Sequence, residues 1–224
     1  GTFVTDLSPL AVDIVADPVC PWCYVGTMSL LAARDRLANE IPLALRWRPY
    51  MLNPATPAEG VDRHAYYREK FPDAEGLAKA RETIRAYAKE SGFDFDPAAP
   101  AHLPNTLKAH MVIRLALGAG NQEEVARAIY RAFWDELRDI GDDETLIDIA
   151  AKAGLPADAV KEMLSSDEEK KSVASEAIAF AKAGVTGVPT FIVGEAVGFT
   201  GGMPPDAIVE RLRRARDVVK ELTA

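Results

Sequence analysis

Both cysteines of this 224-residue chain lie in one segment, CPWC at residues 20–23, where a strand pattern gives way to a helix pattern. Residues 10–16 are rich in branched apolar side chains and are followed by Asp-Pro, which predicts a buried strand. Pro21 suits the first turn of a helix, because no N–H is needed there. Apolar residues then recur at helical spacing to about residue 39. The two cysteines therefore stand at the start of a helix that directly follows a strand.

A second strand is predicted at residues 43–50, where Leu43, Leu45 and Trp47 alternate with polar side chains. Arg46 and Arg48 are expected to form a solvated strand face, although they could meet an anionic substrate. A strand, a helix and a strand joined by a right-handed crossover give two parallel strands. Prolines and turn-forming residues at 51–62 then mark a boundary. The chain is therefore expected to open with a β-α-β unit.

Residues 62–183 predict a run of amphipathic helices, without repeats or low-complexity segments. One predicted apolar stripe consists of Val125, Ile129, Phe133 and Leu137. Three further apolar residues, Phe93, Phe95 and Leu103, are candidates for a lip over a substrate cleft.

Strand patterns return at residues 190–193 and 196–199, with a Gly-Glu turn between them. A last helix is expected to begin near Pro204. It would turn four residues toward the core: Ile208, Leu212, Val219 and Leu222. The sequence thus predicts one α/β domain from residues 1–61 and 184–224, into which residues 62–183 are inserted as an all-helical domain.

The charge composition restricts the classes of partner that the protein is expected to bind. With 34 acidic and 26 basic side chains the net charge is −8, and no basic block suggests nucleic acid or an anionic membrane. No stretch is long and apolar enough to span a membrane, and the first residues, GTFVTDLSPL, show no secretion signal. A cytoplasmic location is therefore the expectation. A monomer and a homodimer both remain open.

The CPWC segment permits several interpretations. A structural disulfide would close almost no loop and so stabilise little, and two cysteines in a chain of this length are not a disulfide framework. A closed zinc site needs four ligands, and the three histidines are scattered, so no metal is expected. Two buried apolar cysteines would be a coincidence at this junction. We favour a redox pair.

The position of each cysteine predicts its role. Free N–H groups and the positive end of the helix dipole favour a thiolate at Cys20, which we assign as the nucleophile. Cys23 lies one turn further and on the same face, so it can attack Cys20 in a mixed disulfide and release the product. Pro21 and Trp22 between them are expected to tune the reduction potential.

The motifs together resemble the thioredoxin superfamily, and specifically its DsbA-like branch. The resemblance rests on CPWCYVG after a strand, a helical insertion, and GVTGVPTFIVG after the insertion. Within that branch, DPVCPWCYVG, LRWRPYMLNP and NTLKAHMVIRLALGAG are similar to the FrnE-like proteins, relatives of 2-hydroxychromene-2-carboxylate isomerase and kappa-class glutathione transferase. The similarity spans about residues 10–222 and implies a thioredoxin-like fold.

The resemblance also has implications for the site. It implies a cis Val188–Pro189 bond that places the Val188 backbone beside Cys20, where an extended substrate would pair. The isomerases and transferases typically carry serine where Cys20 stands and bind glutathione. Two cysteines instead favour dithiol-disulfide exchange, for which no cofactor is required, although glutathione binding is left open.

Three further residues are candidates with competing explanations. Asp17 could act on the thiols or carry their protons, but capping of the helix or turn is the explanation that we favour. The resemblance implies that the helix carrying His110 passes near the cleft, and we favour a core or interface histidine over a proton carrier. Asn53 corresponds to a region that touches glutathione in the transferases, or is a turn residue before a proline.

The leading functional hypothesis is a thiol-disulfide oxidoreductase acting on a protein or low-molecular-weight thiol. An alternative is a glutathione-dependent isomerase or transferase for an aromatic or polyketide-like small molecule. A third is a binding protein that keeps the fold as a scaffold, and the intact cysteine pair argues against it.

Overall fold

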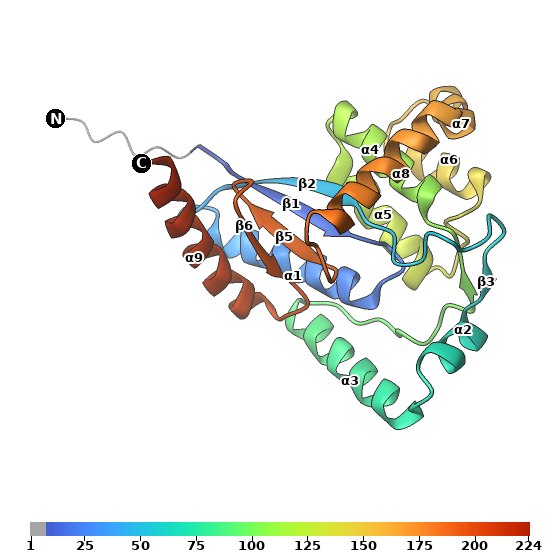
Figure 1. Cartoon of the computed structure of the whole chain (residues 1–224), viewed down its shortest axis with the longest axis horizontal. Coiled ribbons are helices and arrows are strands. Elements are labelled where there is room, and N and C mark those ends of the chain that lie inside the picture. Colours follow the sequence, from blue (N-terminus) through green and yellow to red (C-terminus); the bar gives the residue numbers. More distant parts are fainter. Residues whose placement is uncertain (1–7) are drawn as a thin grey trace.

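The computed structural model describes residues 8–224. Residues 1–7 lie outside this description, and with them the start of the predicted α/β domain and most of the segment judged to lack a secretion signal. In the described part, one mixed sheet occupies the middle of the molecule and helices surround it (Figure 1).

The sheet has four strands in the order β2-β1-β5-β6. Strands β1 (Leu10–Ala16) and β2 (Leu43–Pro49) are parallel, as predicted. Strands β5 (Thr190–Val193) and β6 (Val197–Thr200) form a hairpin, and β5 pairs antiparallel with β1. β1 is buried along most of its length because it has a neighbour on both sides.

Helices α1 (Pro21–Leu37) and α9 (Pro205–Thr223) complete the thioredoxin-like part of the chain. They pack against each other, and α9 also contacts β5 and β6 (Figure 1). The β-α-β unit, the hairpin and the last helix are therefore arranged as the sequence pattern predicts, in an α/β fold of the thioredoxin-like class.

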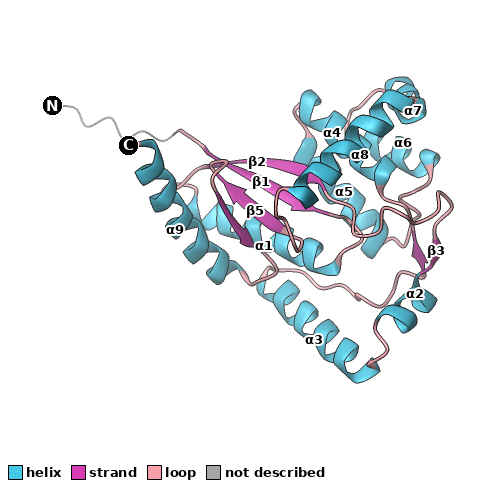
Figure 2. Cartoon of the chain, viewed as in Figure 1, coloured by secondary structure: helices cyan, strands magenta, loops and turns pink. Residues whose placement is uncertain are grey.

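The segment between β2 and β5 is almost entirely helix and loop (Figure 2). Its helices are α2 (Arg63–Lys70), α3 (Ala74–Glu90), α4 (Leu107–Ala119), α5 (Gln122–Trp134), α6 (Asp143–Lys152), α7 (Ala157–Ser165) and α8 (Asp167–Lys182). A short ladder of β3 (Val61–Asp62) and β4 (His102–Leu103), which the sequence did not indicate, ties the start of α2 to the loop before α4.

The inserted helices fasten to β2, which is an edge strand of the sheet. Helices α4, α5 and α8 contact it. The buried Gln122 side chain accepts from Trp47 N at 2.8 Å and donates to Trp47 O at 3.1 Å, as a neighbouring strand would. This amide therefore satisfies backbone groups that an edge strand leaves unpaired.

The arginines of β2 do not form the solvated face that the alternating pattern suggested. Arg46 donates to Asp13 at 3.1 Å and Arg48 donates to Asp13 at 2.9 Å, and Asp13 is only 6% exposed. Arg48 also lies 3.6 Å from Glu176 of α8. The expectation was wrong because a buried carboxylate on the neighbouring strand needs cationic partners.

Two residues of the predicted apolar stripes are exposed. Leu137 is 57% exposed, because α5 ends at Trp134 and Leu137 itself lies in the turn that follows, with φ of 55°. Leu222 is 66% exposed, because it lies in the last turn of α9 beyond the part that meets the sheet. The other members of both stripes are buried or packed against the core.

Gly26 permits the closest approach between α1 and the loop before β5. A Cβ added there would lie 2.6 Å from Pro189 Cγ and 2.7 Å from Gly201 O. Backbone oxygen and a proline ring have little freedom to move, so this position requires glycine for space.

We predict that Gly26→Ala lowers the free energy of unfolding by about 1–3 kcal/mol, the usual cost of overpacking. Gly118→Ala in α4 is the matched control, because a Cβ there meets nothing within 4 Å. Alanine should be neutral or stabilise that helix by about 0.5–1 kcal/mol. Urea unfolding of both variants measures the difference, and equal effects at the two positions would contradict the packing argument.

Candidate functional site

Cys20 occupies the N-cap of α1. Its backbone is extended, with φ of −87° and ψ of 120°, and no side chain caps the helix. The Cys20 Sγ donates to Val188 O at 3.8 Å, across 168 residues of sequence. Cys20 is 6% exposed and lines a cavity, so a substrate in that cavity would meet its sulfur.

The Val188–Pro189 peptide bond is cis and lies beside Cys20, next to the cavity rather than in its lining. Pro189 O accepts from Gly201 N at 2.9 Å, and the ring packs against α1 at Gly26. The structure thus brings together Cys20, Val188 and Pro189, which the sequence analysis placed at one site.

Cys23 lies behind Cys20 and is fully buried. The two thiols are free. Asp17 N lies 3.5 Å from the Cys23 Sγ as a donor. Burial raises the pKa of the Cys23 thiol well above its usual value, and the hydrogen bond with Cys20 raises it further. Cys23 is therefore a protonated, enclosed thiol that only a neighbour such as Cys20 can reach.

Asp17 does not cap α1 with its side chain, which corrects the explanation that we favoured. The carboxylate is 1% exposed; it accepts from Leu52 N at 3.0 Å and lies 3.3 Å from His110 Nε2. His110 is 3% exposed on α4. The structure therefore places a buried carboxylate-imidazole pair next to Cys23, and this pair holds the loop after β2 against the start of α1.

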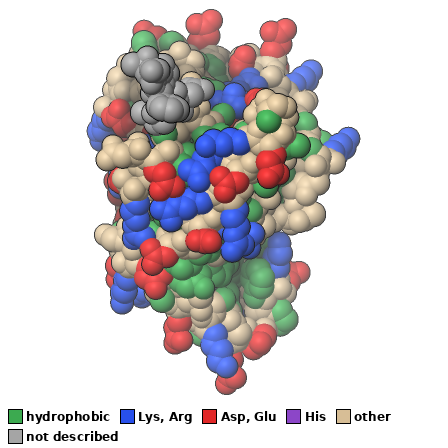
Figure 3. All heavy atoms as spheres, turned by 90° about the vertical axis from the view of Figure 1, so that its left-hand side faces the viewer, with side chains coloured by type: hydrophobic (Ala, Val, Ile, Leu, Met, Phe, Trp, Pro, Cys, Tyr) green, Lys and Arg blue, Asp and Glu red, His purple; other side chains and the backbone are tan. Residues whose placement is uncertain are grey.

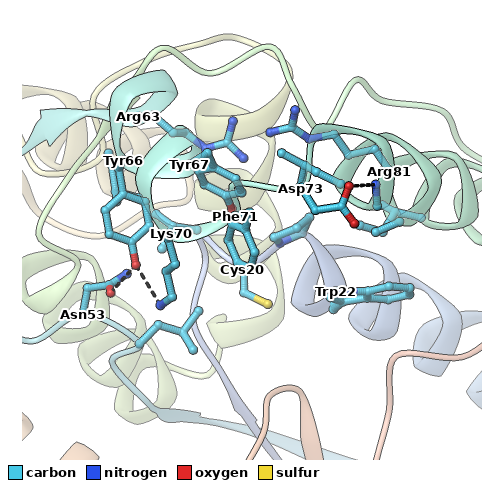
Figure 4. A pocket seen from close by; sticks show the side chains of 18 of the residues that line it. Cys20, Trp22, Asn53, Arg63, Tyr66, Tyr67, Lys70, Phe71, Asp73 and Arg81 are labelled. Atoms are coloured by element: carbon cyan, nitrogen blue, oxygen red, sulfur yellow. Dashed lines mark hydrogen bonds between the residues drawn. The ribbon is translucent and has the colours of Figure 1, made fainter.

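A cavity of about 500 Å³ opens beside Cys20, between the start of α1 and helices α2 and α3 (Figure 4). This volume is typical of small-molecule sites. Pro21 and Trp22 line it, and the Trp22 ring meets Tyr87 of α3 with centroids 6.1 Å apart. Asn53 lines the cavity too, where its Oδ1 accepts from Tyr66 Oη at 2.7 Å, so it is more than a turn residue.

Of the three residues proposed as an apolar lip, Leu103 lines the cavity. Phe93 and Phe95 instead pack on Tyr24, with ring centroids 4.9 Å and 5.0 Å away. They belong to an aromatic cluster under α1 rather than to the cavity.

Most of the residues that line the cavity could not be predicted from the sequence. The cavity wall includes Arg63, Tyr66, Tyr67 and Lys70 from α2 and Arg81 from α3. The tyrosines and lysine in HAYYREK, with Tyr66 and Lys70 one turn apart, were the available signal. Nothing local says that α2 lies over Cys20, so the pattern alone could not assign them to the site.

Trp134 was also missed, although it anchors the insertion to the cysteine loop. Its indole Nε1 donates to Pro18 O at 2.8 Å, and the side chain is 1% exposed. Tyr24, in the second turn of α1, donates to Asp135 at 2.8 Å. Burial and this carboxylate raise the pKa of Tyr24. Both contacts fix the direction in which α1 leaves the cysteines.

No group of three or more metal-ligating side chains lies close enough to hold an ion anywhere in residues 8–224. Over the same residues, no helix is both long and apolar enough to cross a membrane. On the face that carries α9, acidic and basic side chains alternate and apolar ones surround a hollow (Figure 3). This face therefore offers no continuous basic surface for a polyanion.

Known proteins share this fold and, in part, this sequence. The YwbO protein of Bacillus subtilis is 26% identical over 189 residues, which cover 83% of this chain and 88% of YwbO. The solved structure of the probable DsbA oxidoreductase SCO1869 from Streptomyces coelicolor matches with a TM-score of 0.82 at 26% identity, over 93% of this chain and 90% of the other.

Two solved structures of lower identity share the fold. The cytosolic disulfide reductase DsbM from Pseudomonas aeruginosa, solved with GSH, has a TM-score of 0.62 at 21% identity and covers 92% of this chain and 100% of DsbM. A 2-hydroxychromene-2-carboxylate isomerase has a TM-score of 0.61 at 18% identity, over 95% and 96% of the two chains. The sequence profile of the DSBA-like thioredoxin domain matches residues 11–213, and this protein therefore belongs to the DSBA-like thioredoxin domain family.

Proposed function

We propose that this protein is a thiol-disulfide oxidoreductase that exchanges disulfides through Cys20 and Cys23. One observation carries the proposal: Cys20 stands at the N-cap of α1, faces Val188 O at 3.8 Å, and opens on a cavity, while Cys23 lies buried behind it. This is the arrangement that an attacking thiolate and a resolving thiol require.

The exchange has two steps. The Cys20 thiolate attacks one sulfur of a substrate disulfide, which forms a mixed disulfide and expels one substrate thiolate. Cys23 then loses its proton and attacks the Cys20 sulfur, which expels the second substrate thiolate. The substrate gains two electrons and two protons, and Cys20 and Cys23 become a disulfide. The reverse sequence oxidises a substrate dithiol.

The second step requires a proton acceptor, because burial keeps Cys23 protonated. We assign this role to Asp17, which is the carboxylate nearest the thiol in sequence and is held by Leu52 N and His110. Tyr130 is buried near Cys23, and burial raises the pKa of its hydroxyl. Tyr130 therefore stays protonated and cannot serve as the base.

The cavity favours a second candidate function, a glutathione-dependent isomerase or transferase. Its volume of about 500 Å³ suits a small aromatic molecule. In that reaction Cys20 would hold the glutathione thiolate, and Cys23 would have no chemical role. Two cysteines positioned for resolution argue for exchange instead.

Protein and low-molecular-weight thiols are both proposed substrates, with no cofactor required. Glutathione is the small thiol to test first, because the solved structure of DsbM was obtained with GSH. A cytoplasmic location stays our prediction, and it would place the protein among reduced thiols.

We predict that Cys20→Ser abolishes insulin reduction and the oxidative refolding of a reduced protein, because it removes the nucleophile. Cys23→Ser should retain the first step and accumulate a mixed disulfide with the substrate, visible by mass spectrometry. Wild-type protein that is inert in both assays, yet binds glutathione and converts a small aromatic molecule, would favour the second candidate.

We predict that Asp17→Asn slows resolution of the mixed disulfide on the order of a hundredfold, as expected for loss of a general base. Release of the second thiol in a single turnover with dithiodipyridine measures this step. In the variant the rate should rise with pH, because the Cys23 pKa is raised and hydroxide must remove the proton.

The Asp17 charge also raises the Cys23 pKa. Loss of a base and loss of this charge therefore change the rate of the second thiol release in opposite directions. If Asp17 acted only through its charge, asparagine would lower that pKa and speed the second release. Unfolding midpoints of the variant and wild type control for a change in folding.

A further inference from the structure

Three cationic side chains line the cavity beside Cys20. They are Arg63 and Lys70 of α2 and Arg81 of α3, and Asp73 is the acidic side chain among the lining residues (Figure 4). This sign of charge is opposite to the net charge of −8 of the whole chain. The cavity is therefore a local exception to the electrostatics of the protein.

None of these three cations forms an ion pair with a carboxylate in the described residues. Lys70 donates to Tyr66 Oη at 2.9 Å, and the Arg81 guanidinium lies 5.2 Å from the centre of the Tyr67 ring. The carboxylate of Asp73 accepts from Gly76 N at the start of α3. By contrast Arg85, one turn beyond Arg81, pairs with Asp94 at 3.1 Å. The three cations that line the cavity therefore keep their charge free of a carboxylate partner.

Arg63 gives independent support, because it is 1% exposed. It donates to Pro97 O at 2.9 Å and Pro100 O at 3.2 Å, while its Nε has no hydrogen-bond partner. Its guanidinium lies over the Tyr67 ring at 4.4 Å. Asp96 acts on this charge from beyond ion-pair distance, and none of the carboxylates that the structure describes contacts it. A buried charge without a contacting counter-ion is costly, so an anion that enters beside it is stabilised.

The rest of the wall is apolar or aromatic. It includes Val19, Trp22, Leu52, Phe71, Leu77 and Ile84. Such a surface gains free energy when it covers an apolar ligand body. A fully polar anion would leave it unused.

We propose that the cavity selects low-molecular-weight disulfides and thiols that join an apolar or aromatic body to a carboxylate. This deepens the proposed function and rests on it, since the selected disulfide is the one that Cys20 attacks. The carboxylate lies toward Lys70, Arg81 and Arg63, and the body against the apolar wall. Reduction of one such disulfide by the protein dithiol gives two acidic thiols and the Cys20–Cys23 disulfide.

The test compares two aromatic disulfides on the fully reduced protein in single turnovers. Dithiobis-nitrobenzoate carries a carboxylate on each ring, and dithiodipyridine is uncharged at neutral pH. The ratio of their second-order rate constants cancels any change in the reactivity of Cys20 itself. The ratio is the rate constant for dithiobis-nitrobenzoate divided by that for dithiodipyridine. We expect it to fall about two- to fivefold in Lys70→Gln and by a similar factor in the separate variant Arg81→Gln, because exposed charge pairs contribute free energies in this range.

Lys79→Gln is the matched control, because Lys79 is an exposed cation of α3 that does not line the cavity. It changes the net charge equally and should leave the ratio at its wild-type value.

A ratio that stays unchanged in Lys70→Gln and Arg81→Gln, or falls equally in Lys79→Gln, overturns the selectivity. The proposed function would survive that result, provided both reagents still yield the Cys20–Cys23 disulfide. If neither reagent yields it, the proposed function fails and the selectivity fails with it.

Discussion

The site depends on one contact, between the first turns of α1 and the loop that leads into β5. Gly26 has no side chain, so the Pro189 ring and Gly201 O can lie against the helix. This packing brings Val188 O to 3.8 Å from the Cys20 sulfur. The strand pairing of β5 with β1 holds the loop, and β1 leads directly into the cysteines. The sheet and the helix therefore both fix the position of the Cys20 sulfur. A shift of either one would separate this sulfur from Val188 O.

The inserted helices supply what the thioredoxin-like part lacks. Gln122 attaches them to the edge strand β2, and Trp134 attaches them to Pro18 O just before the cysteines. From this anchored base the chain places α2 and α3 over Cys20 and encloses the cavity. His110 comes from the same insertion and completes the pair with Asp17. The thioredoxin-like part provides the two thiols and Asp17, and the insertion provides His110 and most of the cavity wall.

Local sequence patterns predicted the features that local physics determines. Branched residues before Asp-Pro indicated β1, Pro21 indicated the start of α1, and the strand pattern at residues 190–193 indicated β5. Patterns failed where a partner distant in sequence decides the outcome. The sequence pattern indicated a solvated face for Arg46 and Arg48, but both bind Asp13 of the neighbouring strand. The position of Asp17 indicated a helix cap, but its carboxylate pairs with His110 of α4. The cavity cations were missed for the same reason, since their role exists only once α2 lies over α1.

The charge distribution also limits what the site can attract. A chain of net charge −8 repels anions at long range, and screening confines the cavity cations to a range of about 8 Å at physiological salt. A small acidic molecule can enter that range whole, whereas an extended polyanion would keep most of its charge near the acidic surface. Because Arg63 is buried, its charge is screened least and acts only on a ligand that fills the cavity. Size and charge therefore act together, so recognition of a carboxylate requires entry beside Cys20.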